Sequence, residues 1–488
     1  MIRAWSPAAV YEAEAALMAT LPEGELMARA VAGLAEVARL RLHQRGGTRV
    51  VALVGPGNNG ADALYAAAEL AADGANVAAV HLPGTVHDGA YAAALAAGVV
   101  LTDAVEPIAE ADLVLDGILG IGGRPGLPEW ARTWVEQVPD PAYVIAVDLP
   151  SGADPEGHVL DPGGVFADET VTFSVAKPVH LLPATEAACG LLTVVDIGLE
   201  LTSAPAVRRL THDDVADLWP VPGSRDDKYS RGVVGVVAGG ERYSGAAVLT
   251  VTAAVESGAG MVRYAGSPAP TGLVRAAVPE AVIGIGRVQA WVIGPGLDVT
   301  ELDPAQRAAA LDALASDLPV VVDAGGLDLI EGRRSAPTLL TPHAGECARL
   351  VTRLARAAGG AAEWTLTRVE VEADPLRWAR DLARQTGATV LLKGATTLVV
   401  DAEGASFSQA DAPPWLATAG AGDVLAGLLG TLLAAGLPPA TAGALGALVH
   451  GVAAERANPG GPVRALRVAQ SLGPTIAHLL ATGSGAAT

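Results

Sequence analysis

Cysteine is almost absent from this chain of 488 residues, which contains only Cys189 and Cys347. Two cysteines so far apart in the sequence do not indicate a disulfide framework or a cysteine metal site. Basic residues are also scarce, because 32 lysines and arginines stand against 53 aspartates and glutamates and leave a net charge of −21. Neither nucleic acid nor an anionic membrane is therefore expected as the main partner. Local backbone amides and a few placed cations would have to hold any phosphorylated ligand.

Long apolar runs of the kind that cross a membrane are missing too. The start, MIRAWSPAAVYEAEAAL, has no uninterrupted apolar core and does not resemble a signal peptide. Residues 424–454 lack Asp, Glu, Lys and Arg, but Gly436-Leu437-Pro438-Pro439 divides them into two pieces, each shorter than the ~20 apolar residues of a transmembrane helix. We therefore expect two buried helices joined by a turn, in a soluble cytoplasmic protein.

The sequence does contain a regular alternation of strand-like and helix-like segments. Hydrophobic residues make up 51% of the chain, enough to form two or three cores at this length. An opening helix over about residues 12–41 can turn at 21–24. Beyond it, apolar runs separated by amphipathic helices predict a parallel sheet covered on both faces. The predicted elements are strands at 49–54, 76–82, 112–119, 143–150, 169–175 and 191–198, and a helix at 61–74.

A second set of strands follows the polar, proline-spaced segment 202–227, where we place the domain boundary. Within this set, Asp374-Pro375 predicts a helix start with an N-cap and proline at the first helical position. The predicted fold class is α/β with two tandem three-layer domains, a Rossmann-like one over residues 1–206 and a second one over 211–488. The predicted strands of the second domain lie at 232–240, 290–296, 318–326, 338–346, 388–395 and 396–404.

The loop GPGNNG at residues 55–60 formally matches the dinucleotide fingerprint G-x-G-x-x-G. The next strand, NVAAVHLPG, does not end in the acidic residue that a ribose would need, so a standard nicotinamide-dependent dehydrogenase is disfavoured. Asn58 and Asn59 either offer uncharged oxygens and donors to a hard cation or polar ligand, or only adopt the dihedral angles of a turn.

Further polar residues close the neighbouring strands. Asp116 lies in DGILGIGGRPG, and Asp148 and Ser151 lie in VDLPSGADPEG. Each acid alone could serve as a helix cap, but the carboxyl ends of parallel strands meet at one edge, where open α/β sheets bind ligands. Lys177 either faces the same crevice or is exposed to solvent.

The strings GPGNNGADA, DGILGIGGRPG and VDLPSGADPEG resemble the NAD(P)HX epimerases, which act on hydrated nicotinamide cofactors. The resemblance implies potassium ligands from Asn59, Asp116 and Ser151, and acid/base roles for Asp148 and Lys177. This family usually reads Asn-Asn-Gly-Gly-Asp-Gly, so Ala61 and Ala63 each add a methyl group where a ligand would lie on the backbone. The implied hydrate-binding residues are Asn58, Asn59, Gly60, Ala61, Asp62, Gly120, Ile121, Gly122, Gly123, Arg124, Pro125, Gly126 and Asp148.

Near the C-terminus, residues 417–427 read ATAGAGDVLAG and lead into a long apolar stretch. Glycines directly before a helix expose unpaired N–H groups at the positive end of its dipole, which favours an anion. Asp423 is then either the N-cap of that helix or a base held beside a bound anion.

Three other stretches of the second half carry polar groups at strand ends. AGGERYSGAA (238–247) joins a strand to a helix, LTPHAGE (340–346) exposes His343, and LLKGATT (391–397) places Lys393 before a glycine. Singly, such a histidine is usually structural and such a lysine solvated. Together with residues 417–427 they predict a phosphate site with a base.

These stretches resemble the ADP-dependent NAD(P)H-hydrate dehydratases of the ribokinase-like superfamily. The resemblance implies a ribokinase-like sheet, with Asp423 as the base that deprotonates a substrate hydroxyl. At 321–326, VVDAGG keeps Asp323 of the usual Asp-Ala-Asp-Ala but has Gly325 in place of the second acid. The implied hydrate ligands are Ala247, Gly296, His343 and Asp423. The implied ADP ligands are Lys393, Gly394, Ala395, Thr396, Thr397 and Gly422.

The sequence therefore predicts a bifunctional enzyme for repair of nicotinamide nucleotides. Its first half would interconvert the epimeric hydrates NADHX and NADPHX, and its second half would dehydrate the S form with ADP. We expect potassium as a cofactor, Mg²⁺ as a further candidate ion, and a homo-oligomer. The alternatives are a ribokinase-like kinase of small molecules such as a vitamin precursor, and a first half that only binds nucleotide or acts as a scaffold.

Overall fold

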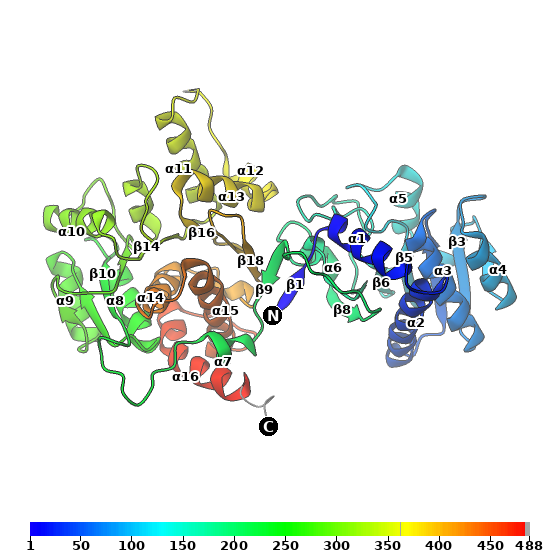
Figure 1. The fold of residues 1–488 in the computed structure, drawn as a ribbon, viewed down its shortest axis with the longest axis horizontal. Helices are drawn as coiled ribbons and strands as arrows, with labels where there is room; N and C mark the ends of the chain where they lie inside the picture. The colour runs from blue at the N-terminus through cyan, green and yellow to red at the C-terminus, as the bar shows by residue number, and fades with distance from the viewer. Residues whose placement is uncertain (362, 484–488) are drawn as a thin grey trace. The chain divides into compact units, whose positions relative to one another are not determined.

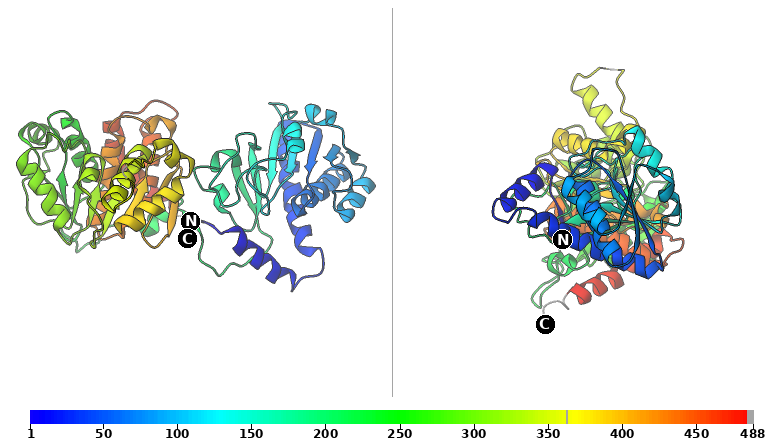
Figure 2. Two further views of the ribbon diagram at one scale, coloured as in Figure 1. Left: turned by 90° about the horizontal axis from the view of Figure 1, so that it is seen from above. Right: turned by 90° about the vertical axis from the view of Figure 1, so that its right-hand side faces the viewer.

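The computed structural model describes residues 1–361 and 363–483. It divides the chain into two compact units, Arg3–Val207 and Arg208–Thr488 together with Met1–Ile2, called here the N-terminal and C-terminal units. Each unit has a mainly parallel sheet between two layers of helices (Figure 1, Figure 2). The predicted fold class, two tandem three-layer α/β domains, is thus confirmed.

The sheet of the N-terminal unit is entirely parallel and has the strand order β4-β3-β2-β5-β6-β7-β8. From β2 the chain adds β3 and β4 on one side, and it then returns to add β5 and the later strands on the other side of β2. This reversal creates a crevice at the carboxyl ends of β2 and β5, where open α/β sheets bind ligands. The strands are β2 (Arg49–Val54), β3 (Asn76–His81), β4 (Val100–Thr102), β5 (Leu113–Gly117), β6 (Tyr143–Val147), β7 (Glu169–Phe173) and β8 (Leu191–Val195).

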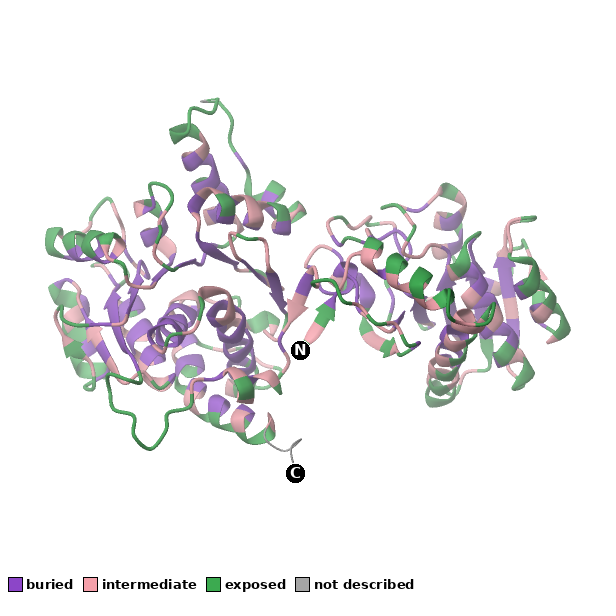
Figure 3. Cartoon of the chain, in the orientation of Figure 1, coloured by how far each residue is buried: buried purple, intermediate pink, exposed green. Residues whose placement is uncertain are grey.

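Alternation along β2 shows why helices cover both faces of this sheet. Val50 and Val54 pack against α2 and α3, whereas Val51 and Leu53 pack toward η1 and α5 on the opposite face. Figure 3 shows the strands buried and the outward faces of the helices exposed. The remaining elements are β1 (Ile2–Ala4), α1 (Pro7–Met18), α2 (Glu25–Arg45), α3 (Asn58–Ala72), α4 (Asp88–Ala96), η1 (Glu106–Glu110), α5 (Glu129–Val135), η2 (Pro178–His180) and α6 (Glu186–Cys189).

The sheet of the C-terminal unit continues from β9 in the order β9-β18-β17-β16-β15-β14-β13-β10-β11-β12. Only β17 runs antiparallel to its neighbours, β16 and β18. The strand order reverses between β10 and β13, which places a second crevice there. The strands are β9 (Val207–Arg209), β10 (Val233–Val237), β11 (Met261–Tyr264), β12 (Val282–Ile283), β13 (Ala290–Ile293), β14 (Val320–Val322), β15 (Thr338–Leu340), β16 (Thr389–Leu392), β17 (Thr397–Val400) and β18 (Ser406–Gln409).

Helices cover both faces of the second sheet (Figure 1). One face carries α7 (Asp214–Leu218), α8 (Ser244–Glu256), α9 (Pro268–Ala277), α14 (Ala421–Ala434), α15 (Pro439–Ala457) and α16 (Ala465–Gly483). The other face carries α10 (Pro304–Ala315), η3 (Ala324–Leu329), α11 (Ala344–Ala357), α12 (Arg368–Ala373) and α13 (Pro375–Thr386), and η4 (Pro414–Leu416) precedes α14.

Three local predictions can be compared with the structure. The apolar stretch near the C-terminus forms α14 and α15, which turn at Gly436 with φ 92°. None of the described helices combines the length and the apolar character needed to cross a membrane. Asp374 caps α13 by accepting a hydrogen bond from Arg377 N at 3.2 Å, with Pro375 at the first helical position. The opening helix is divided into α1 and α2 by a turn that ends at Gly24, which has φ 81°.

Candidate active sites

A cavity of about 390 Å³ lies at the crevice of the N-terminal sheet and brings together most of the predicted hydrate-binding residues. Its walls come from the turn after β2, the glycine loop after β5 and the end of β6. The predicted residues that line it are Asn58, Asn59, Asp62, Gly120, Ile121, Gly122, Gly123 and Asp148. The opening helices α1 and α2 close it with side chains that the sequence did not single out, among them Tyr11, Glu14, Met18, Leu26 and Met27.

The remaining predicted hydrate-binding residues lie outside this lining. Gly60 packs so closely on the turn that an added Cβ would lie 2.1 Å from the carbonyl oxygen of Gly55. Ala61 and Ala63 belong to α3 and are buried in the hydrophobic core, so their methyl groups do not narrow the cavity. Residues 124–126 continue the loop beyond it, and Arg124 and Pro125 are exposed.

Asp148 and Lys177 form a buried ion pair at one wall of the cavity. Asp148 has φ 65°, in the region that residues other than glycine rarely adopt, and such strain is typical of functional positions. The Lys177 ammonium donates to Asp148 Oδ1 and, at 2.8 Å, to Thr172 Oγ1, which also donates to Asp148 at 2.9 Å. Burial opposes ionisation of Asp148, but Lys177 outweighs burial and lowers the pKa of this carboxyl group. Asp148 is therefore ionised.

His180 contacts the backbone of both residues of this ion pair. Its Nδ1 accepts a hydrogen bond from Lys177 N at 3.0 Å, so Nε2 carries the proton and donates to Asp148 O at 2.8 Å. Burial and the charge of Lys177 lower the pKa of His180 to about 4, which keeps the imidazole neutral. Lys177 is only 1% exposed and does not line the cavity, so Asp148 separates it from the cavity.

Two more carboxyl groups line the same cavity. Asp62, in the first turns of α3, has its Oδ1 buried without a hydrogen-bond partner among the described residues. Burial and the charges of Asp148 and Glu14 raise its pKa to about 8. Burial and Asp148 also raise the pKa of Glu14. The cavity thus contains one ionised carboxylate beside carboxyl groups that hold protons more tightly than usual.

The predicted potassium ligands meet around the backbone of Leu119. Ser151 Oγ donates to Asp116 Oδ1 at 2.6 Å and accepts from Leu119 N at 2.8 Å, while Asn59 Nδ2 donates to Leu119 O at 3.0 Å. Asp116 is fully buried with neutral hydrogen-bond partners, and burial raises its pKa to about 6. A buried carboxylate among hydroxyl, amide and carbonyl oxygens fits a hard cation.

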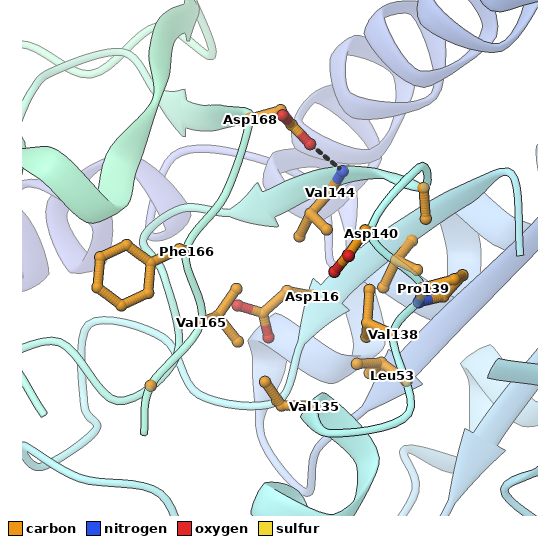
Figure 4. Close-up of a pocket in the computed structure, with 13 residues that line it drawn as sticks. Leu53, Asp116, Val135, Val138, Pro139, Asp140, Val144, Val165, Phe166 and Asp168 are labelled. Atoms are coloured by element: carbon orange, nitrogen blue, oxygen red, sulfur yellow. Dashed lines mark hydrogen bonds between the residues drawn. The ribbon is translucent and has the colours of Figure 1, made fainter. Parts of the chain in front are cut away.

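A second cavity, of about 330 Å³, reaches Asp116 from the α5 side of the sheet (Figure 4). Mostly apolar side chains, including Val135 and Val165, surround the aspartate there. Asn59 does not line this cavity. In the part of the chain that the structure describes, no three His, Cys, Asp or Glu side chains cluster closely enough to form a metal site.

In the C-terminal unit, α14 begins at the predicted glycine turn. Gly420 is the N-cap with φ 89°, and Asp423 is the third residue of the helix. No side chain caps this end, so Asp423 does not have the simple capping role that the sequence left open. Burial and the charge of Asp323 raise the pKa of the half-buried Asp423 to about 7, although Lys393 opposes this shift.

Lys393 lies beside the first turn of α14. A Cβ added to Gly422 would lie 3.4 Å from Lys393 Nζ and 3.7 Å from Asp323 Oδ2. Lys393 Nζ donates to Asp323 Oδ1 at 2.7 Å and lies 3.8 Å from Glu346 Oε2. Burial opposes the charge of Lys393, but these two carboxylates outweigh it and raise the pKa of the lysine. The site therefore combines the Lys393 cation with the exposed backbone amides at the start of α14.

His343 has a structural role at one edge of this site. Its Nδ1 caps α11 by accepting from Gly345 N at 3.0 Å and from Glu346 N at 3.3 Å, and Glu346 accepts from His343 N at 2.8 Å. The exposed ring also lies next to Lys393, because His343 and Lys393 form an isolated parallel bridge. The structural interpretation of this histidine therefore agrees with its capping role, whereas its contact with the hydrate stays a prediction.

The other predicted ligands of this unit lie near the start of α8 and after β16. Ala247 is buried under Gly239, and Gly296, with φ 65°, lines a cavity of about 260 Å³ near the start of α8. The predicted ADP residues Gly394, Ala395 and Thr396 lie in the turn between β16 and β17, and Thr397 is the first residue of β17.

Asp323 and Thr341 are side chains at this site to which sequence reasoning assigned no role. Asp323 is 2% exposed at the end of β14 and accepts from Thr341 Oγ1 at 2.8 Å as well as from Lys393. The sequence contained one signal for Asp323, because a polar residue directly follows the buried strand in VVDAGG.

Two family models match parts of this chain. The family model described as NAD(P)H-hydrate dehydratase matches residues 234–466, and the one described as YjeF-related protein N-terminus matches residues 23–179. A bifunctional NAD(P)H-hydrate repair enzyme Nnr from Mycobacterium leprae is 45% identical over 476 residues, covering 93% of this chain and 94% of that protein. Its counterpart from Mycobacterium tuberculosis is 46% identical over 450 residues, covering 88% and 89%.

A solved structure of an ADP/ATP-dependent NAD(P)H-hydrate dehydratase from Bacillus subtilis, co-crystallised with ATP/Mg²⁺, is also similar. It is 25% identical with a TM-score of 0.49, and the match covers 56% of this chain and 99% of that one. The full-length relatives, with identity of 45% across both units, decide the assignment. The chain belongs to the family of bifunctional NAD(P)H-hydrate repair enzymes.

Proposed function

We propose that the two units catalyse successive steps in the repair of hydrated nicotinamide nucleotides. The N-terminal unit interconverts the R and S hydrates of NADH and NADPH, and the C-terminal unit dehydrates the S hydrate at the expense of ADP. Two observations support this division: the N-terminal cavity lies at the switch point of its own sheet, whereas the C-terminal unit groups Asp423 with Lys393 and Asp323 at the start of α14, and relatives that span both units carry the name of a bifunctional repair enzyme.

The observation that supports the dehydratase most strongly is the position of Asp423. This carboxylate lies in the first turn of α14, beside Lys393 and next to Gly422. Amides of the turn and the lysine would hold the phosphates of ADP, and Asp423 would take the proton from the C6 hydroxyl of the hydrate. The hydroxyl oxygen then attacks the β-phosphorus, and AMP leaves.

The phosphorylated hydrate then has a good leaving group at C6. Its C6–O bond breaks with help from the electron pair of the ring nitrogen, phosphate departs, and loss of a proton from C5 restores the C5–C6 double bond. Asp423 has a pKa near 7 because of burial and Asp323. A base is most effective when its pKa lies close to the working pH, so this value suits the step.

In the N-terminal unit, Asn58, Asn59 and residues 120–123 would bind the hydrate, with Asp148 at the reacting ring. A potassium ion would be held by Asn59, Asp116 and Ser151, because the buried Asp116 carboxylate is paired only with neutral groups, Ser151 contacts it directly, and Asn59 meets the same loop at Leu119 O. Such an ion would fix the two glycine-rich loops against each other. Mg²⁺ would accompany the phosphates of the nucleotide in the C-terminal unit.

The deciding experiment supplies purified R or S hydrate of NADH with ADP or ATP and follows the near-ultraviolet absorbance of NADH. We expect recovery from both epimers with ADP, and faster recovery from R in potassium than in lithium buffer. A phosphorylated product without NADH would instead indicate a kinase. Recovery from S alone would leave the N-terminal unit as a binding module. The predicted homo-oligomer is tested separately by light scattering of the purified chain.

A further inference from the structure

Epimerisation of the hydrate, on which this inference rests, needs a proton donor as well as a proton acceptor. The hydroxyl at C6 must leave from one face of the ring and water must return on the other. The leaving group needs a proton, because hydroxide departs poorly, and the returning water must lose one. A site with only one ionised carboxylate can supply the second function but not the first.

Asp148 has the environment that a proton acceptor requires. It is 7% exposed, lines the cavity, and is held by Lys177, Thr172 and the backbone contact from His180. Because the ammonium of Lys177 donates directly to it, Asp148 remains a carboxylate. Lys177 does not line the cavity and is committed to Asp148 and Thr172, so it is a positioning residue and not the missing donor.

Asp62 has the opposite environment in the same cavity. It comes from the first turns of α3, whereas Asp148 follows β6. Its Oδ1 is buried and meets no hydrogen-bond partner among the described residues. The charged groups that face it are Asp148 and, from α1, Glu14, and both are acidic. An isolated carboxyl group with a buried oxygen among like charges holds its proton.

We propose that Asp62 is a second catalytic residue of the N-terminal unit, which gives its proton to the departing hydroxyl while Asp148 receives the proton of the incoming water. The C6–O bond breaks with its electron pair, the Asp62 proton completes a water molecule, and the electron pair of N1 forms a C6–N1 double bond. Water adds to C6 from the other face and passes one proton to Asp148. Transfer of that proton from Asp148 back to Asp62 through cavity water restores the starting state.

Two carboxyl groups with separated pKa values mark the acid and the base of such a pair. The pKa of Asp62 is raised to about 8 by burial, Asp148 and Glu14, whereas that of Asp148 is lowered by Lys177. As the donor must be protonated, epimerisation should decline as the pH rises through about 8. Tyr11 and Glu14 of α1 also line this cavity and can titrate. Burial raises the pKa of both groups.

The test uses the full chain without ADP and measures interconversion of purified R and S hydrates by chromatography. Asp62→Asn keeps the shape of the side chain but has no acidic proton, so we expect a fall of at least ~100-fold in rate. Binding of the hydrate should change only a few-fold, and the decline above pH about 8 should disappear from the residual rate. Asp62→Glu keeps the acid and should retain more activity.

Glu69→Gln, at an exposed position of the same helix, is the matched control and should behave like the wild type. Dehydration of S hydrate with ADP reports that the C-terminal unit of each variant is intact, and retained binding of the hydrate together with an unchanged circular dichroism spectrum reports that the N-terminal unit is folded. The proposal would be overturned if Asp62→Asn kept activity within threefold of the wild type, or if its rate still declined at alkaline pH. It would also be overturned if Asp62→Asn and Asp62→Glu lost equal activity. A wild-type chain that interconverts no epimers would instead refute the proposed function of the unit.

Discussion

Asp323 affects two functional side chains of the C-terminal unit at once. It forms the 2.7 Å ion pair that places Lys393, and its charge raises the pKa of Asp423. Both effects depend on its burial, because charges interact more strongly away from water. Asp323 is therefore expected to set the pH range of the dehydratase without touching the reacting hydroxyl.

The Asp323→Asn variant tests this role. As the proposed base, Asp423 must be ionised, so the wild-type dehydration rate should fall as the pH decreases through about 7. Removal of the neighbouring negative charge lowers the pKa of Asp423, so the fall should move to lower pH. The measurement is kcat/KM for S hydrate against pH.

Thr341→Val is the matched control, because it removes the 2.8 Å hydrogen bond to Asp323 but keeps the charge. Its pH profile should stay near that of the wild type. A profile for Asp323→Asn that is unchanged, or shifted to higher pH, would contradict the electrostatic role of Asp323.

Sequence reasoning located residues that stand directly at strand ends and in glycine turns. Asp148 lies after β6 at the cavity, Asp423 lies in the first turn of α14, and Lys393 lies beside that turn, whereas their roles stay predictions. It did not find Glu14, which reaches the cavity from α1, far from the other lining residues in sequence. It also did not show that Lys177 is buried behind Asp148, because burial depends on how β7 and η2 pack.

At the scale of elements, long apolar strands were predicted well and short ones were missed. The strand predicted at 49–54 coincides with β2, because Val and Leu bury both faces of it. In contrast, β4, β11 and β12 were not predicted. They have two to four residues each, and β4 and β12 lie at sheet edges, where burial leaves little pattern in the sequence.

The start of α14 is the element to which the proposed binding of ADP assigns the phosphates. Gly420 permits the left-handed N-cap, and Gly422 leaves space between the first-turn amides and Lys393. In the Gly422→Ala variant the backbone keeps its helical conformation, but the methyl group extends toward Lys393 Nζ. We expect ADP affinity to fall about tenfold, which corresponds to ~1.4 kcal/mol.

Gly272→Ala in α9 provides the comparison, because no atom lies within 4 Å of its added Cβ. This change should leave ADP affinity unaltered and should stabilise the helix slightly, by up to ~1 kcal/mol. Calorimetric titration with ADP and thermal unfolding separate the two effects. Equal ADP affinity in Gly422→Ala and the wild type would show that the phosphates do not lie in this turn.

At the scale of the whole molecule, each unit has its own sheet, hydrophobic core and charged site. Substitutions in well-separated sites usually have additive effects, so damage to one site should leave the chemistry of the other intact. The hydrate is the only component that both reactions share. A chain with one inactive site should therefore stop at an identifiable epimer.

The Asp423→Asn chain supplied with purified R hydrate and ADP tests the account most directly. It keeps the N-terminal site but lacks the base that activates the C6 hydroxyl. We predict that S hydrate accumulates, that ADP still binds, and that NADH absorbance does not recover. Recovery of NADH at more than about a hundredth of the wild-type rate would show that Asp423 is not the base, and R hydrate left unconverted would show that the N-terminal unit is not an epimerase.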